Sequence, residues 1–315
     1  MGGDLNPVLP DDPHNYRDQG FPEHLIFTDW GSNDSTILDL VTDDGATLGS
    51  VLLFDEKLSA NENLSCGTCH KQAKSFADET PLSMGVTENT TRNSMQLNDL
   101  GWTNRVGFFW DMSESDLKNM ISLPLKNENE IGLTDIDQLI DKLNNTDYYP
   151  KLLENAFGDS ENSEERISDA LTQFISSMTT FNSKFDKSHL DESILSESEI
   201  NGRDIFKQTC EFCHVDGNSF FFFEGILDFP FIFNNGLSET ADLGAGVVFG
   251  DKFNHLFKVP TLRNIVQTSP YMHDGRFDTL EEVIDHYSED IEANVWTGEF
   301  IPEGGFQFTD TQKQI

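Results

Sequence analysis

The chain has 315 residues, and its 56 Asp and Glu against 20 Lys and Arg give a formal net charge of −36. This charge argues against nucleic acid as a partner, because phosphate binding needs clustered Lys and Arg, and it disfavours anionic membrane surfaces. No apolar run approaches the ~20 residues of a membrane-spanning helix. The acidity could steer a basic redox partner toward the protein, or it could serve only solubility.

The first half of the chain begins with an irregular arm. Residues 1–45 are rich in Asp, Pro, Asn and Gly and show little periodicity, which is typical of a segment laid over the surface. A short apolar segment at 51–54 leads into Cys66-Gly67-Thr68-Cys69-His70. Apolar residues at helical spacing then predict one helix over 135–143 and a longer one over 164–186.

The second half follows a polar link at 187–193. A helix is predicted to start at Ser196, because Ser196 and Glu199 have the spacing of a capping box, and it runs into Cys210-Glu211-Phe212-Cys213-His214. The very aromatic segment 220–233 is too irregular for a helix or strand, and we expect it to pack inward. Strand content is low throughout, so the predicted fold class is mostly α.

Every cysteine of the chain belongs to one of two Cys-x-x-Cys-His motifs, the attachment signature of a c-type haem. Two thiols on one helical turn can each add to a vinyl group of one porphyrin, and the histidine that follows is delivered to the iron. A structural zinc site usually has its cysteine pairs closer together, and a redox pair has no use for the histidine. We therefore predict two covalently bound haems, held by Cys66, Cys69 and His70 and by Cys210, Cys213 and His214.

Two cofactors on a chain of this length predict two domains. We place an N-terminal haem domain at 46–193 and a C-terminal haem domain at 194–315. Covalent haem is normally attached outside the cytoplasm, so we expect a periplasmic or exported protein whose leader is not present in this chain.

Further segments keep a specific order and spacing around the motifs: Leu53-Phe54-Asp55, Leu58-Ser59, Ser65-Cys66, Arg92-Asn93, Phe109-Trp110-Asp111, Phe257-Lys258-Val259-Pro260-Thr261-Leu262-Arg263-Asn264 and Pro270-Tyr271-Met272-His273-Asp274-Gly275-Arg276-Phe277. Over about residues 48–290 the chain thereby resembles the bacterial dihaem cytochrome c peroxidase/MauG family. The resemblance implies two mostly α-helical, cytochrome c-like domains that face each other. It also implies a peroxide site at the N-terminal haem and an electron relay at the C-terminal haem.

The resemblance singles out the sixth ligand of the C-terminal haem. This ligand is a methionine in the dihaem peroxidases, whereas the matching position here is Tyr287, which resembles MauG. Phenolate ligation favours high-valent iron, as in catalase, so the second haem could share a two-electron oxidation. Met272 or His286 is the alternative ligand.

The resemblance also assigns the peroxide site. Trp110, Pro124 and Glu130 match the family's inter-haem tryptophan, distal proline and distal glutamate. A carboxylate above the iron can take a proton from peroxide and return it to the departing oxygen, and burial would raise its pKa toward the working range. Trp110 is either a bridge for electrons between the haems or an ordinary core tryptophan.

Two positions depart from the family pattern. The distal glutamine falls on Met120, which cannot donate a hydrogen bond to peroxide and could itself be oxidised. The histidine that blocks the resting iron in many members is missing, because no histidine lies between His70 and His189. We therefore expect a five-coordinate N-terminal haem, which points to the MauG-like side.

The family also holds a calcium ion. Asn93, Thr268 and the carbonyl of Pro270 match its ligands, and such oxygen ligands suit Ca²⁺.

Arg263 and Arg276 are the expected partners of haem propionates, since a guanidinium pairs well with carboxylates.

The leading hypothesis is an oxidoreductase that uses hydrogen peroxide and passes oxidising equivalents through Trp110 to a Tyr287-ligated haem. A MauG-like enzyme would oxidise residues of a partner protein, whereas a cytochrome c peroxidase would draw electrons from a small cytochrome c or cupredoxin. The alternative outside enzymes is a dihaem electron carrier with two six-coordinate haems. Monomer and homodimer both stay open.

Overall fold

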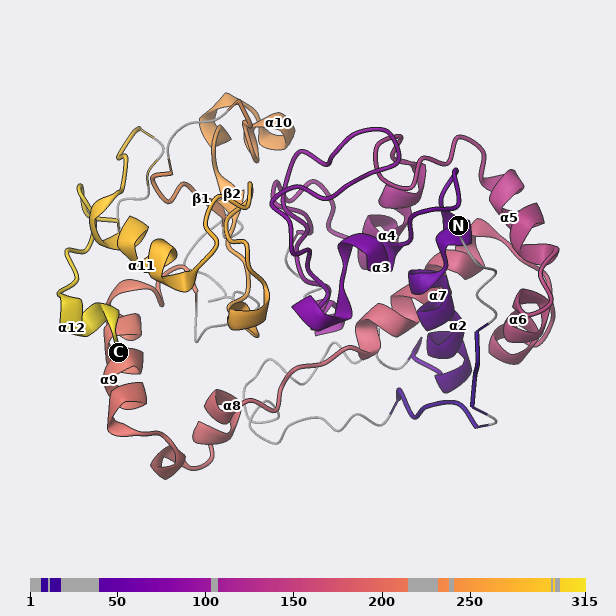
Figure 1. The fold of residues 1–315 in the computed structure, drawn as a ribbon, viewed down its shortest axis with the longest axis horizontal. Coiled ribbons are helices and arrows are strands. Elements are labelled where there is room, and N and C mark those ends of the chain that lie inside the picture. Colours follow the sequence, from indigo (N-terminus) through magenta and orange to yellow (C-terminus); the bar gives the residue numbers. More distant parts are fainter. Residues whose placement is uncertain are drawn as a thin grey trace. The chain divides into compact units, whose positions relative to one another are not determined.

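The computed structural model describes residues 7–10, 12–17, 40–102, 107–214, 232–237, 241–295, 297 and 301–315, with only the backbone of Trp102. The chain forms two compact units (Figure 1). The first unit combines Met1–Asn104 with Asp116–Thr180, and the second combines Arg105–Ser115 with Phe181–Ile315. Arg105–Ser115 therefore belongs with the C-terminal half, although it lies within the predicted range 46–193. The predicted domain boundaries stay predictions.

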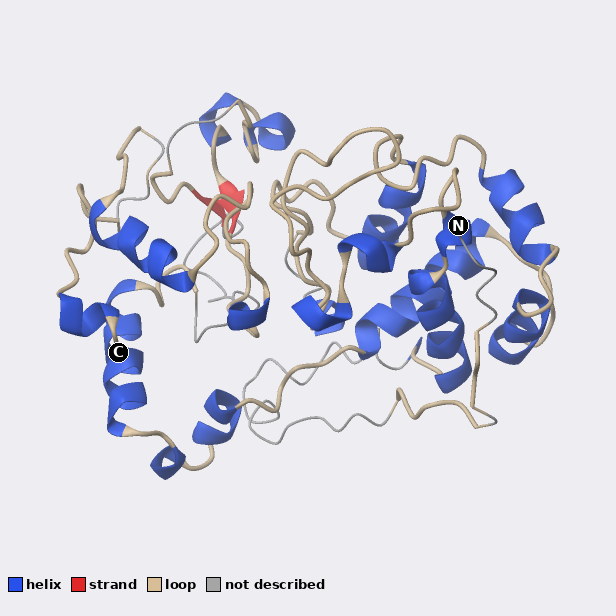
Figure 2. Cartoon of the chain, viewed as in Figure 1, coloured by secondary structure: helices blue, strands red, loops and turns tan. Residues whose placement is uncertain are grey.

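Helices make up most of the regular structure of the described residues (Figure 2). The α-helices of the first unit are α2 (Asp43–Phe54), α3 (Cys66–Cys69), α4 (Leu117–Lys126), α5 (Ile136–Asn144), α6 (Tyr149–Phe157) and α7 (Glu164–Ser177). Those of the second are α8 (Lys184–Ser188), α9 (Glu197–Thr209), α10 (Gly246–Phe249), α11 (Leu280–Glu289) and α12 (Asp310–Lys313), with an antiparallel pair of short strands, β1 (Ile232–Phe233) and β2 (Phe257–Lys258). The prediction of a mostly α fold is confirmed. In the part of the chain that the structure describes, no helix has the length and apolarity to span a membrane.

The core of the first unit lies between α2 and α7, with α6 packed on α2 and α4 on α7. Leu48 and Leu52 of α2 and Ile167 and Leu171 of α7 are each at most 1 % exposed. Gly49 permits this close packing, because a Cβ at that position would lie 1.9 Å from the carbonyl oxygen of Ala170. The apolar periodicity of 164–177 is thus core packing.

Two predicted helices are confirmed. Helix α5 begins directly after Asp135, whose carboxylate accepts a hydrogen bond from the Asp137 N–H. Helix α9 begins after Ser196, and Ser196 and Glu199 form the expected capping box. These starts depend on side chains three or fewer positions away, which is why the sequence pattern alone located them.

The single long helix predicted over 164–186 is wrong. Helix α7 ends at Ser177, and α8 begins only at Lys184. The backbone between them is held by Asp99, whose N–H donates to the Met178 carbonyl at 2.8 Å. The Asp99 carboxylate also accepts from the Thr180 N–H at 2.7 Å. A partner about eighty residues earlier therefore overrides the local helical pattern.

Two other predictions fall largely outside the described residues. Of the predicted arm at 1–45, the structure describes 7–10, 12–17 and the residues from 40 onward, and α2 already begins at Asp43. Of the aromatic segment 220–233, only Ile232 and Phe233 are described, and they form β1.

Candidate functional site

The first Cys-x-x-Cys-His motif, residues 66–70, forms one turn of helix with a histidine at its end. Cys66 and Cys69 begin and end α3, and Ser65 precedes it as the N-cap. The Nδ1 of His70 lies 2.8 Å from the carbonyl oxygen of Phe76. Because that oxygen can only accept, Nδ1 carries the proton and Nε2 keeps a lone pair for a metal. Burial lowers the pKa of His70, which favours this neutral form.

The second motif, residues 210–214, has the same arrangement in the other unit. Cys210 caps the C-terminus of α9, and the His214 N–H donates to the Cys210 carbonyl at 2.9 Å. The Nδ1 of His214 lies 3.0 Å from the carbonyl oxygen of Pro260. Burial lowers the pKa of His214 to about 4. Both histidines are therefore neutral, and Nε2 is the nitrogen left to ligate a metal.

The cysteine environments fit thioether formation better than zinc binding. All four cysteines are free and partly buried, and burial raises the pKa of the Cys66 and Cys213 thiols to about 12. A structural zinc site is usually formed by four Cys or His side chains that lie close together. Across the described ranges, no group of three or more His, Cys, Asp or Glu side chains is placed to hold a metal ion. The residues of each motif therefore fit a covalently attached haem with one histidine ligand.

The structure brings Glu130 close to the first motif. The Glu130 carboxylate contributes to raising the pKa of both Cys66 and Cys69. Burial in turn raises the pKa of Glu130 above its ordinary value. The Asn127 side-chain amide donates to Glu130 Oε1 at 2.8 Å, so the direction of the carboxylate is fixed.

The turn that carries Glu130 is built on the end of α4. The carbonyl of Pro124 accepts from the Asn127 N–H at 3.3 Å and from the Ile131 N–H at 3.4 Å. Met120 lies one turn earlier in α4 and is buried. Pro124 and Met120 thus belong to the element that positions Glu130, whereas their direct roles toward peroxide stay predictions.

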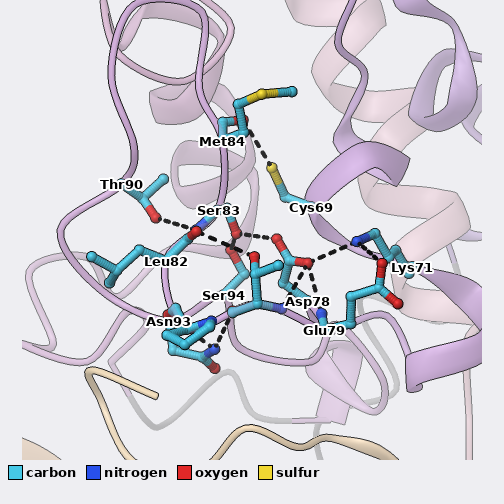
Figure 3. A network of polar contacts seen from close by, with 12 residues as sticks. Cys69, Lys71, Asp78, Glu79, Leu82, Ser83, Met84, Thr90, Asn93 and Ser94 are labelled. Atoms are coloured by element: carbon cyan, nitrogen blue, oxygen red, sulfur yellow. Dashed lines mark hydrogen bonds and ion pairs between the residues drawn. The ribbon is translucent and has the colours of Figure 1, made fainter. Parts of the chain in front are cut away.

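Residues 83–86, which fall at the place of the family's blocking histidine, are held next to Cys69 (Figure 3). Ser83 donates to Asp78 Oδ2 at 2.5 Å and lies 2.7 Å from Ser94 Oγ. The Cys69 Sγ is 3.9 Å from the carbonyl oxygen of Met84. This segment is thus anchored by short side chains and offers no imidazole to the first haem.

In the second unit, Tyr287 lies near the second motif. Cys210 and Cys213 both contribute to the raised pKa of the Tyr287 phenol, which burial brings to about 12. The Asn235 side-chain amide donates to the Tyr287 hydroxyl oxygen at 3.1 Å, an interaction that opposes this rise. Asn235 therefore orients the phenol and stabilises its ionised form.

The two alternative ligands differ in their surroundings. The Nε2 of His286 lies 3.0 Å from the carbonyl oxygen of Asn235 and must donate to it, so this nitrogen is already engaged. The Sδ of Met272 lies 3.5 Å from the same Asn235 amide that contacts Tyr287. Asn235 was missed by sequence reasoning, because nothing in the pattern marks an asparagine 52 residues before the tyrosine.

Trp110 is 9 % exposed and belongs to the second unit. Its ring lies 6.4 Å from that of His273, and the His273 ring stacks on Phe257 at 3.7 Å. The carbonyl of Trp110 accepts from the Lys258 N–H at 2.7 Å, which ties the residue to β2. These contacts are those of a packed tryptophan, and its role as an electron bridge stays a prediction.

Both arginines expected at haem propionates already pair with carboxylates of the protein. Arg263 contacts Asp186 at 2.6 Å, and Arg276 contacts Asp274 at 2.6 Å. Sequence reasoning overlooked Lys258, which is 7 % exposed and whose pKa is lowered to about 8 by burial. No carboxylate among the described residues forms an ion pair with Lys258. Its side chain is therefore a further candidate partner for a haem propionate in this unit.

The residues expected to bind calcium belong to both units. The Asn93 amide nitrogen donates to the carbonyls of Thr80 and Pro81 at 3.2 and 3.3 Å, which fixes the direction of its side chain. Asn93 lies in the first unit, and Thr268 and Pro270 lie in the second. The calcium site stays a prediction.

Comparisons of the sequence and of the structure with known proteins find dihaem peroxidases and MauG-like proteins. Residues 43–193 match the family described as di-haem cytochrome c peroxidase. The methylamine utilization protein MauG of Methylophilus methylotrophus is 31% identical over 255 residues, covering 78% of this chain and 72% of its own. Cytochrome c551 peroxidase of Nitrosomonas europaea is 32% identical over 257 residues, covering 77% and 72%. The crystal structure of a MauG-like protein associated with microbial copper homeostasis has a TM-score of 0.76 at 27% identity, over 87% of each chain.

Proposed function

The chain belongs to the di-haem cytochrome c peroxidase family that includes MauG, and from this we propose that it is a peroxide-using oxidoreductase with two functionally different haem sites. The first unit uses hydrogen peroxide with Glu130 as the acid–base group. In the second unit, His214 and Tyr287 would supply the protein ligands of the haem iron. Each haem is attached by thioethers to the two cysteines of its motif.

The observation that carries the proposal is the contrast between the residues near the two motifs. An oriented, partly buried carboxylate lies near Cys66 and Cys69, and a phenol lies near Cys210 and Cys213. A carboxylate that does not ligate the metal suits proton transfer, whereas a phenol oxygen suits ligation. A pure electron carrier would have no use for this difference.

Glu130 performs the proton transfer in peroxide reduction. When bound, the haem iron supplies the electrons that peroxide accepts. Glu130 takes the proton from one peroxide oxygen and delivers it to the other, so that this oxygen leaves as water. Asn127 holds one carboxylate oxygen, and the other carries the proton. Because burial raises the pKa of Glu130, its carboxyl group takes up and releases a proton at a pH closer to neutral.

We propose that Tyr287 makes the enzyme MauG-like, so that oxidising equivalents are used on a partner protein. The Asn235 amide supports this role, because its hydrogen bond favours an anionic phenol oxygen. The second candidate function is that of a cytochrome c peroxidase supplied by a small cytochrome c or cupredoxin. It is favoured by Met272, whose sulfur lies on the same amide.

Further parts of the proposal rest on likeness to the family. They are a route through Trp110 between the haems, a calcium ion held by Asn93, Thr268 and the Pro270 carbonyl, and contacts of Arg263 and Arg276 to propionates. Covalent haem also supports a periplasmic or exported location.

The test is spectroscopy of the purified ferric protein. We expect two covalent haems per chain, one high-spin and one low-spin, and a rapid change of the high-spin signal on addition of peroxide. The variant Tyr287→Phe should change the low-spin signal, and the matched variant Met272→Leu should not. Two low-spin haems without a peroxide reaction would contradict the enzyme proposal, and the reverse response of the two variants would favour the cytochrome c peroxidase.

A further inference from the structure

Two adjacent tyrosines at the start of α6 share one carboxylate oxygen. The Tyr148 hydroxyl donates to Asp55 Oδ2 at 2.6 Å, and the Tyr149 hydroxyl donates to the same atom at 2.9 Å. Their ring centroids are 4.6 Å apart with an interplanar angle of 42°. Asp55 is the C-cap residue of α2, and α6 packs on α2, so tertiary packing assembles the three groups.

This cluster lies near the first haem motif. The Cys66 thiol is close enough to the Tyr149 phenol to contribute to its raised pKa. Helix α3, which carries Cys66, packs on the end of α2, where a Cβ on Gly67 would lie 2.4 Å from the Phe54 ring. Tyr149 is only 1 % exposed, whereas Tyr148 is partly exposed. The two phenols therefore lead from the neighbourhood of Cys66 toward the surface.

Tyr148 and Tyr149 differ from Tyr271 in the chemistry of the group that accepts their hydroxyl hydrogen bond. A phenol that loses an electron becomes strongly acidic, so its oxidation is eased when a base can take the proton. The Asp55 carboxylate is such a base. The Tyr271 hydroxyl instead donates to the carbonyl oxygen of Ile265 at 3.0 Å, and a carbonyl oxygen is not a base of useful strength.

We propose that Tyr149, Tyr148 and Asp55 form a redox relay that carries oxidising equivalents, one electron at a time, from the first haem site to a one-electron reductant at the protein surface. The relay rests on the proposed peroxide chemistry of the first unit. It gives the oxidising equivalents of that unit a route to the surface that does not involve Tyr287 or the second haem.

Each step of the relay balances in electrons and protons. Tyr149 gives one electron to the cofactor that peroxide has oxidised, and its O–H bond breaks as the proton passes to Asp55 Oδ2. Tyr148 then gives one electron to the Tyr149 radical. Asp55 returns its proton to the Tyr149 oxygen and accepts the proton of Tyr148. The reductant finally supplies one electron to the Tyr148 radical, and the proton on Asp55 returns to the Tyr148 oxygen.

The relay can be tested by electron paramagnetic resonance of full-length holoprotein frozen soon after peroxide is added. We expect an organic radical whose hyperfine structure narrows when all tyrosines are ring-deuterated. The signal should be lost in Tyr149→Phe and retained in the control Tyr271→Phe. In Tyr148→Phe we expect a radical at Tyr149 that ascorbate, as the added reductant, quenches more slowly than in the wild type.

Asp55→Asn tests the proton acceptor but keeps the hydrogen bond with which the Asp55 side chain caps the short 3₁₀ helix Glu56–Leu58. The amide oxygen can still accept from the Lys57 N–H, as Asp55 Oδ1 does at 2.9 Å, but the side chain can no longer take a proton. We expect the radical to form more slowly, with a solvent isotope effect that differs from the wild type. A merely structural role would lower the unfolding midpoint of the variants and leave the radical unchanged, which would overturn the relay.

The outcomes distinguish the relay from the proposed function. If peroxide changes the high-spin signal but no deuterium-sensitive radical forms, or if the radical persists in Tyr149→Phe, the relay is wrong while the proposed function stands. If peroxide leaves the high-spin signal unchanged in wild-type protein, both are wrong.

Discussion

The two histidine motifs reach the same local geometry by different means. His70 Nδ1 bonds a carbonyl six residues later, at Phe76, within one turn-rich segment. His214 Nδ1 bonds a carbonyl 46 residues later, at Pro260. The first motif therefore needs only its own neighbourhood to orient its imidazole. The second depends on the correct placement of the segment 257–264.

That segment is anchored by a buried ion pair. Arg263 is paired through two nitrogens with Asp186 at 3.0 and 2.6 Å, and both side chains are under 10 % exposed. Asp186 also closes the capping box of α8 with Ser183. The imidazole of the first motif is thus oriented by a local contact, whereas that of the second relies on a segment held by a charged contact between distant parts of the chain.

The largest expected effect concerns the first site alone. Replacing Glu130 by Gln keeps the shape but removes proton transfer, so the rate of the peroxide reaction should fall by roughly 10²–10⁴-fold. Stopped-flow absorbance at the high-spin haem measures it. The matched control is Glu128→Gln, an exposed carboxylate two positions away that should react at the wild-type rate. An unchanged rate in Glu130→Gln would remove the acid–base assignment.

The second prediction concerns the anchor of the second site. Asp186→Asn leaves Arg263 buried without its counter-charge, which should destabilise the second unit by about 3–5 kcal/mol. Denaturant unfolding followed at the low-spin haem measures this loss. The control Asp159→Asn breaks the exposed pair with Arg166 in the first unit and should cost only about 0–1 kcal/mol. Equal costs would mean that the second site does not depend on this contact.

The same ion pair gives a pH dependence with a defined sign. Burial alone would raise the pKa of Asp186, but the hydrogen bonds from Arg263 and Ser183 outweigh it and lower the pKa from 3.8 to about 2. A carboxyl group whose pKa is lower in the folded than in the unfolded protein stabilises the fold at pH values above 3.8. This contribution disappears as the pH falls from 3.8 toward 2. Acid unfolding of Asp186→Asn should therefore show a weaker pH dependence over that range than the wild type.

A smaller effect should follow from removing the amide that contacts Tyr287. Asn235→Leu deletes a hydrogen bond to an ionisable phenol, typically worth about 1.5–3 kcal/mol when the partner is charged. We expect phenolate ligation to need a pH higher by roughly 1–2 units, because one pKa unit corresponds to 1.36 kcal/mol. A pH titration of the charge-transfer absorption measures it, with Asn235→Asp as the variant that keeps size but not the donor. An identical titration in Asn235→Leu would show that the amide does not support the ligand.

The smallest expected effect is the fall in the rate of the peroxide reaction at acidic pH, the acid limb of its pH profile. Because burial raises the pKa of Glu130 above 4.5, its base form is lost at a higher pH than for an ordinary glutamate. The rate should therefore fall as the pH decreases toward this raised pKa, and the limb should vanish in Glu130→Gln. A limb that persists in the variant would belong to another group.

Several features could be predicted from the sequence because their causes are local. The spacing of Cys66 and Cys69 within one helical turn, and the following His70, already predict a haem attachment. Ser196 with Glu199 located the start of α9. Glu130 and Tyr287 were assigned only through the resemblance to a family, and the structure adds that they lie near the first and second motif respectively.

Other features were decided by contacts between residues far apart in the chain. The break after Ser177 depends on Asp99, the orientation of Tyr287 on Asn235, and the pairing of Arg263 on Asp186. The two tyrosines likewise meet Asp55 only because α6 packs on α2. Periodicity and capping patterns report interactions within a few residues, whereas these hydrogen bonds join residues 52 to 94 positions apart. Such partners exist only once the chain has folded, because the packing of the helices brings them within bonding distance.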